Sequence, residues 1–213
     1  MRITSIEQLP RKRGYEVRID HVLVVRLSPD VLVQSQIRPG QEISDERLKE
    51  IEGTEARHSA LTGALRLLSY RPRSEKEMRD ALRRRGVAPE LLAETIGRLR
   101  ELRLLDDADF ARTYVDLRDR TAPRGRRLLA QELKARGVNR QTIEAPVAEV
   151  NETDAAYRAG VRRAQSLAKL PYADFRRKLG DHLLRRGFGY ETARETVGRL
   201  WTEVGGGDAT DSE

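Results

Sequence analysis

Three aspartates, Asp106, Asp107 and Asp109, form the densest group of carboxylates in the sequence. Carboxylates at this spacing are ligands that Mg²⁺ or Ca²⁺ accepts, so the segment is a candidate site for a divalent cation. It also lies at the predicted start of a helix. Acids at that position accept hydrogen bonds from the first backbone N–H groups and face the positive end of the helix dipole. We therefore interpret the aspartates as a helix cap and predict no metal site.

Other side chains that serve as metal ligands or nucleophiles are sparse. The histidines, His21, His58 and His182, fall in different predicted elements, and none has a second ligand at metal-binding spacing. The sequence has no cysteine, which excludes disulfides and thiolate chemistry. It has neither a P-loop nor a Gly-x-Ser-x-Gly elbow. These observations favour a protein that works by binding, without a cofactor, rather than an enzyme.

Cations form the pattern with the clearest chemical meaning. Arg124, Arg127, Gln131 and Lys134 follow the spacing i, i+3, i+7, i+10, which places them along one face of a predicted helix. Such a face can meet phosphates or carboxylates, although solvated surface helices carry similar faces. We predict that these residues bind a partner and are exposed. The corresponding positions of two similar helices add Arg73, Lys76, Arg83 and Arg177, with acids interspersed.

The distribution of charge also favours a polyanionic partner. Residues 1–57 hold ten basic and ten acidic side chains, whereas residues 58–204 hold 31 basic and 21 acidic ones, a net charge of +10. An excess of this kind is typical of proteins that bind nucleic acid. Arginine-rich composition with solvated helix faces is the alternative explanation. The sequence has no apolar run that fits a signal peptide or a bilayer span, so we expect a cytoplasmic protein without membrane contact.

The chain repeats itself with a period near fifty residues. Gly86, Gly137 and Gly187 end three copies of the pattern L-x-x-R-G-[V/F] and lie 51 and 50 residues apart. A proline precedes the same predicted helix in each copy, at positions 72, 123 and 171. Such a period indicates a stacked array of small helical units. Each glycine is placed to adopt the left-handed conformation that ends a helix.

The expected fold is mainly α, with three tandem three-helix repeats preceded by a small β-hairpin or sheet. Residues 2–9 and 15–27 are rich in β-branched side chains and are predicted to be extended. A short helix is predicted from Ser44 to about Glu52. The predicted domains are a β-rich extension with a short helix (1–55), repeat 1 (56–105), repeat 2 (106–150), repeat 3 (151–204) and a disordered acidic tail (205–213).

Two longer motifs resemble those of a known family. Leu105-Asp-Asp-Ala-Asp-Phe-Ala111, followed by Glu132-Leu-Lys-Ala-Arg-Gly-Val138, is similar to the central motif of the RecX family of recombinase regulators. Residues 64–86 are similar to the first-repeat motif of that family, and the likeness extends over about residues 56–204. The third repeat departs slightly, with Phe188 after its glycine.

The resemblance implies a regulator that binds the RecA recombinase filament on single-stranded DNA and inhibits its ATPase and strand-exchange activities. It also implies weaker, non-specific binding to single- and double-stranded DNA, and we expect a monomer. The alternative is a sequence-specific regulator of the helix-turn-helix kind, which would need polar side chains at the start of each third helix. Only the segment Asn139–Ile143 has them. A nucleic-acid-processing enzyme would need clustered acids or histidines.

Overall fold

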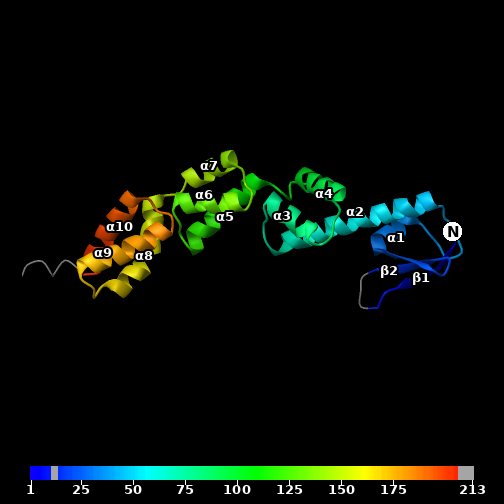
Figure 1. Ribbon diagram of the computed structural model, residues 1–213, viewed down its shortest axis with the longest axis horizontal. Helices are drawn as coiled ribbons and strands as arrows, with labels where there is room; N and C mark the ends of the chain where they lie inside the picture. Colours follow the sequence, from blue (N-terminus) through cyan, green and yellow to red (C-terminus); the bar gives the residue numbers. More distant parts are fainter. Residues whose placement is uncertain (11–13, 206–213) are drawn as a thin grey trace, which may run out of the picture. The chain divides into compact units, whose positions relative to one another are not determined.

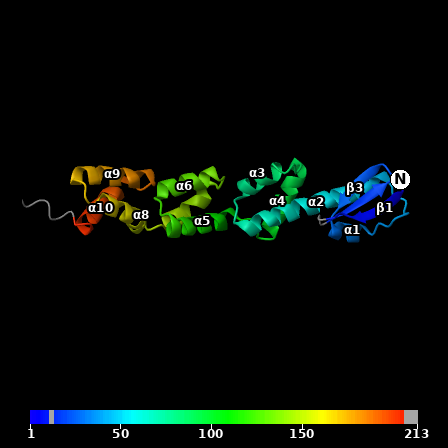
Figure 2. The same cartoon turned by 90° about the horizontal axis from the view of Figure 1, so that it is seen from below.

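The computed structural model describes residues 1–10 and 14–205, which form three strands and ten helices (Figures 1 and 2). The strands are β1 (Ile3–Gln8), β2 (Tyr15–Ile19) and β3 (Leu23–Leu27). The helices are α1 (Pro29–Ser35), α2 (Asp45–Tyr70), α3 (Glu75–Arg83), α4 (Pro89–Glu101), α5 (Asp107–Thr121), α6 (Arg126–Ala135), α7 (Arg140–Ala148), α8 (Glu152–Leu167), α9 (Tyr172–Arg185) and α10 (Tyr190–Glu203). The predicted fold class is confirmed. Most of the expected acidic tail, residues 206–213, lies outside the described residues.

The chain divides into two compact units. The N-terminal unit comprises residues 1–72 and 78–104, and the C-terminal unit comprises residues 73–77 together with the chain from Leu105 onward. The C-terminal unit therefore contains the start of α3 as well as α5 to α10. Within residues 1–10 and 14–205, no helix combines the length and the apolar character that crossing a bilayer requires.

A three-stranded antiparallel sheet of order β1-β2-β3 begins the N-terminal unit. Alternate residues of β2 and β3, such as Val17 and Val25, are buried against α1 and α2. Residues 15–27 form two strands because Asp20 and His21 both have positive φ values, 48° and 63°, as a type I′ hairpin turn requires. Val22 N–H closes this turn on the Ile19 carbonyl, so the extended segment predicted from the sequence is a hairpin in itself.

Helix α2 (Asp45–Tyr70) spans the predicted boundary between the extension and repeat 1. The short helix expected to end near Glu52 and the helix expected from residue 56 are one continuous helix. Ser44 caps it, as predicted, by accepting a hydrogen bond from Arg47 N–H. Gly53 does not interrupt it, and the Thr54 hydroxyl donates to the Glu50 carbonyl one turn earlier. Helix α1 was not predicted, although Ser28 caps it and Pro29 occupies its first turn.

The repeat motif ends a helix in each repeat, as its glycines indicated. Gly86, Gly137 and Gly187 have φ values of +79°, +87° and +85° at the ends of α3, α6 and α9. The leucines four residues before them, at positions 82, 133 and 183, are fully buried. The next residue of each repeat turns its N–H back to the carbonyl of that leucine, closing the helix end.

Repeats 2 and 3 share one hydrophobic core within the C-terminal unit. It runs from Phe110 and Val115 of α5, through Leu133 of α6, to Phe175 of α9 and Leu200 of α10. Helices α8, α9 and α10 pack on one another, and α7 packs on both α5 and α6. This continuity fixes the positions of the polar side chains that project from α5, α6, α8 and α9.

Close backbone contacts join successive repeats in this unit. Gly125 N–H donates to the Arg186 carbonyl at 2.9 Å, so the start of α6 lies on the end of α9. A Cβ atom at Gly125 would lie 2.1 Å from the Gly187 carbonyl oxygen, which only glycine avoids. The start of α3 meets the end of α6 in the same way, with the Ser74 hydroxyl donating to the Arg136 carbonyl at 2.6 Å.

Candidate binding surface

Helix α6 presents the face that the cation spacing predicted. Leu129 and Leu133 are buried in the core, and Arg127, Gln131 and Lys134 are exposed on the other side of the helix. Within the part of the chain that the structure describes, these three side chains make no hydrogen bond or ion pair. They are therefore available to an external partner, and two of them carry a positive charge.

Arg124 does not belong to this exposed face. It precedes the helix, whose N-cap is Gly125, and its guanidinium forms an ion pair with Glu132. Its side chain is 24% exposed. The expected exposure of Arg124 was therefore wrong: the spacing grouped Arg124 with the helical positions, although it precedes the N-cap Gly125.

The other predicted cations have partners within the chain. Lys76 Nζ donates to the Ala135 carbonyl at 3.2 Å, at the C-terminal end of α6, where the helix dipole favours a cation. Arg83 lies 3.6 Å from Asp80, and Arg177 lies 3.0 Å from Asp174. Arg73 is half-buried beside the start of α3 and also interacts within the chain. Among the predicted residues, Lys76 and Lys134 are thus brought to the same end of α6.

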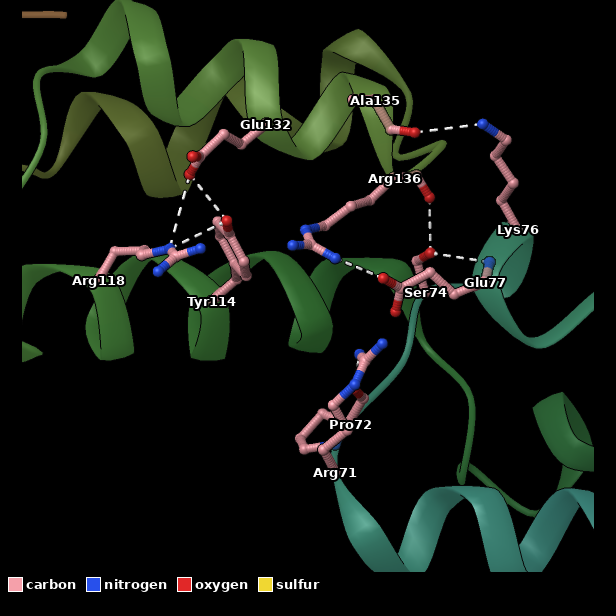
Figure 3. A network of polar contacts seen from close by, with 10 residues as sticks. All are labelled: Arg71, Pro72, Ser74, Lys76, Glu77, Tyr114, Arg118, Glu132, Ala135 and Arg136. Atoms are coloured by element: carbon pink, nitrogen blue, oxygen red, sulfur yellow. Dashed lines mark hydrogen bonds and ion pairs between the residues drawn. The ribbon is translucent and has the colours of Figure 1, made fainter. Parts of the chain in front are cut away.

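Behind the exposed face of α6 lies a polar network that joins it to α5 (Figure 3). Glu132 accepts a hydrogen bond from the Tyr114 hydroxyl at 2.7 Å and lies 3.6 Å from Arg118. Arg118 donates to the Tyr114 hydroxyl at 3.0 Å and lies over its ring. Together with Arg124, two arginines therefore share one carboxylate in a half-buried site.

The same network extends to the start of α3. Arg136 forms an ion pair with Glu77, and its guanidinium lies 4.9 Å from the centre of the Tyr114 ring (Figure 3). Burial opposes the charge on Arg136, but Tyr114 and the Glu77 carboxylate favour it more strongly, so its pKa is raised. At the start of α3, the Ser74 hydroxyl accepts a hydrogen bond from Glu77 N–H at 3.2 Å and so caps the helix. The Glu77 side chain also ties the segment to repeat 2.

The aspartates of the central motif act as caps. The Asp106 carboxylate accepts hydrogen bonds from the N–H groups of Ala108 and Asp109. Asp107 accepts from Glu75 N–H at 2.8 Å, which holds the start of α3 on α5. Among the described residues, no group of three or more acidic or histidine side chains is arranged to hold a metal ion.

A second group of cations was missed by the sequence analysis. Arg120, Arg162, Arg163 and Arg186 come from α5, α8 and the end of α9, and they line one hollow of the C-terminal unit. No single helical spacing relates them, because they come from three different helices. A position-by-position comparison of repeats 2 and 3 would have drawn attention to them, since Arg163 and Arg186 occupy the positions of Arg118 and Arg136.

Three models of one protein family match the chain in succession. They describe the first three-helix domain of RecX over residues 60–99, the second over 106–145 and the third over 151–197. The matched ranges follow the three predicted repeats.

Curated relatives and solved structures agree with these matches. The chain is 31% identical to regulatory protein RecX of Enterococcus faecalis over 87% of this chain and 72% of that protein. It is 32% identical to regulatory protein RecX of Lactobacillus johnsonii over 93% and 74%. A crystal structure of RecX from Lactobacillus salivarius superimposes with a TM-score of 0.61 and 25% identity, covering 69% of this chain and 97% of that one. A crystal structure of regulatory protein RecX, at 21% identity and a TM-score of 0.66, covers 95% and 98% and supports the fold.

Proposed function

Since the chain belongs to the RecX family, we propose that it is a non-enzymatic regulator of recombination and DNA repair that binds the RecA recombinase filament on single-stranded DNA. In this proposal it inhibits the ATPase and strand-exchange activities of the filament. It binds DNA itself more weakly and without sequence preference, and it acts as a cytoplasmic monomer.

The observation that carries the proposal is the unpaired basic face of α6 within a family of recombination regulators. Arg127 and Lys134 stand exposed on one helix, with Gln131 between them and without intramolecular partners in the described chain. Repeated helical units suit a filament, because each unit can bind a successive protomer and several weak interactions add up to tight binding. Arginine and lysine at such an interface meet carboxylates of the protein or phosphates of the DNA.

The test measures RecA ATPase on single-stranded DNA with increasing amounts of this protein. We expect the parent to inhibit and the variant Arg127→Ala/Lys134→Ala to inhibit at least ten-fold less effectively. Removing a charge-assisted hydrogen bond from a desolvated interface costs about 1.5–3 kcal/mol. Arg124 is left intact because its pairing with Glu132 supports the fold. If the folded variant inhibits as well as the parent, the exposed face of α6 does not bind the recombinase.

A matched control is Arg140→Ala/Arg194→Ala. It removes the same number of charges from exposed helix positions where each arginine is already paired with an acid of its own helix, Glu144 and Glu191. Co-sedimentation with the filament should show the same ranking as ATPase inhibition. Circular dichroism verifies that both double variants fold.

The helix-turn-helix alternative has less support. Asn139 and Arg140, at the start of α7, are the polar residues suited to reading bases, but the Asn139 side chain caps the helix and Arg140 pairs with Glu144. Binding to one duplex sequence that survives high salt would favour this alternative. Affinity that falls steeply with salt and ignores sequence would favour the proposed regulator.

A further inference from the structure

Repeat 3 has an open cationic cavity at the place where repeat 2 has its closed polar network. The helix caps Asp106 and Asn151 align α5 with α8 at an offset of 45 residues, and the glycines align α6 with α9 at an offset of 50. Buried residues coincide under this alignment: Ala111 of α5 matches Ala156 of α8, and Leu133 matches Leu183. The polar positions can therefore be compared one by one.

Both acids of the network are lost in repeat 3. Glu132 is replaced by His182, and Glu77 by Leu128. The ring of Tyr114 is replaced by the methyl group of Ala159, which leaves the space open. The arginines remain: Arg163 and Arg186 take the positions of Arg118 and Arg136. The position of the histidine agrees with this assignment, since its Nε2 lies 3.3 Å from the Ala159 carbonyl.

The resulting cavity has a volume of about 600 Å³ and lies between the end of α5, α8 and α9. Five arginines and His182 line it, and none of the described carboxylates does. Arg158 is neutralised by Asp119 and Asp154. The side chains of Arg120, Arg162 and Arg163 have no hydrogen bond or ion pair within the described residues. Thr121 and Ser166 also line the cavity, but their hydroxyls donate to the Leu117 and Arg163 carbonyls of their own helices.

The excess of positive charge in the cavity affects the pKa of His182. Burial lowers the pKa of His182, and Arg186, Arg163 and Arg185 lower it further, outweighing its interaction with the Ala159 carbonyl. Arg186 has a partner at its guanidinium, the Pro123 carbonyl at 3.3 Å, but this oxygen carries no net charge. An anion in the cavity would supply the negative charge that Glu132 supplies in repeat 2.

We propose that this cavity binds the phosphate backbone of a nucleic-acid strand. An acidic protein segment offers scattered carboxylates and needs apolar contacts beside them, whereas a strand offers one phosphate per nucleotide to several arginines at once. Guanidinium groups match phosphate oxygens in a two-pronged geometry. The inference deepens the DNA-binding part of the proposed function and rests on it, while the α6 face remains the surface that binds the recombinase.

The test measures binding to a fluorescent thymidine 20-mer, without recombinase, by anisotropy at several salt concentrations. The variant Arg162→Gln/Arg163→Gln should bind at least ten-fold more weakly than the parent. Its salt dependence should also be shallower, since a single strand contributes about 0.7 to the log–log slope per phosphate bound. The control is Arg140→Gln/Arg194→Gln, which has the same net charge and should bind within two-fold of the parent. Equal binding by the two double variants would overturn the proposal.

A second pair of variants separates binding from folding. His182→Glu places a carboxylate beside Arg163 and Arg186, as in repeat 2, so the protein should remain folded with an unchanged or higher melting temperature while its DNA affinity falls at least five-fold. Gln141→Glu makes the same charge change on the exposed first turn of α7 and should leave the affinity within two-fold. A His182→Glu protein that is folded and retains parental affinity contradicts the inference.

Competition identifies the ligand. An abasic phosphodiester 20-mer should displace the fluorescent strand from the parent, and a polyglutamate of equal charge should do so at least ten-fold less well. The opposite ranking would assign the cavity to an acidic protein segment and overturn the phosphate proposal. Because these assays contain no RecA, failure here leaves the ATPase test intact, and loss of ATPase inhibition alone leaves the cavity assignment intact.

Discussion

Repeat 2 surrounds Glu132 with arginines and a tyrosine hydroxyl, whereas repeat 3 places His182 among arginines and leaves a cavity. The two repeats keep the same buried leucines and the same left-handed glycines. The buried leucines and the left-handed glycines therefore define the fold whether or not a carboxylate neutralises the arginines beside α6 and α9. In one repeat the charges hold helices together, and in the other they face solvent.

The largest expected effect comes from opening the network of repeat 2. Glu132→Gln removes the carboxylate that Arg118 and Arg124 share, leaving two half-buried guanidinium groups without a counter-charge. Breaking such a pair from one side costs about 3 kcal/mol. Urea denaturation followed by circular dichroism measures the loss.

The control for this variant is Glu144→Gln. Glu144 pairs with Arg140 on the exposed side of α7, and exposed ion pairs contribute at most about 0.5–1 kcal/mol. If both variants lose equally little stability, the network of repeat 2 is no more structural than a surface pair. Repeats 2 and 3 would then differ in the presence of a cavity but not in how much their charged groups stabilise the fold.

Much of this fold follows from periodic signals in the sequence. Leu82, Leu133 and Leu183 each lie four residues before a repeated glycine, a spacing that predicts a buried leucine in the last turn of a helix, and all three are buried. The cavity of repeat 3 was not predicted, because Arg120 and Arg163 come together only through the packing of α5 and α8.

Two local errors have similar physical reasons. Arg124 was assigned to the exposed face of α6 by its spacing alone, although it precedes the N-cap Gly125 and its guanidinium pairs with Glu132. Glu132 was seen only as part of a motif. Its role depends on Tyr114, eighteen residues away on another helix.

A second expected effect concerns the junction between repeats 2 and 3. Gly125→Ala directs a methyl group onto the Gly187 carbonyl, which forces the backbones apart at a cost of about 1–3 kcal/mol. Gly198→Ala, inside α10, meets no neighbouring atom and should instead stabilise the protein by about 0.5–1 kcal/mol. Thermal unfolding compares the two alanine variants. Equal shifts of both would contradict the close approach that joins the repeats.

The smallest expected effect is the response of repeat 3 to pH. His182 is faced by Arg120 of α5, by Arg162 and Arg163 of α8, and by Arg185 and Arg186 at the end of α9. Burial and these charges lower its pKa in the folded protein, so the unfolded chain binds a proton more readily. Stability is therefore lost as the pH falls from about 6.5, the usual pKa of histidine, towards the folded value. His182→Gln should remove this part of the loss.

The mechanism is checked by titrating the His182 ring with NMR. Arg163→Gln removes one of the charges that disfavour the imidazolium, so it should move the pKa of His182 upward from the parental value. A bound oligonucleotide should raise the pKa of His182 as well, because phosphates in the cavity offset the same arginines. Two results would contradict this mechanism. One is a parental pKa of His182 at or above the usual value for histidine. The other is a pKa that neither Arg163→Gln nor the oligonucleotide changes; either would show that the arginines of repeat 3 are as fully neutralised as those of repeat 2.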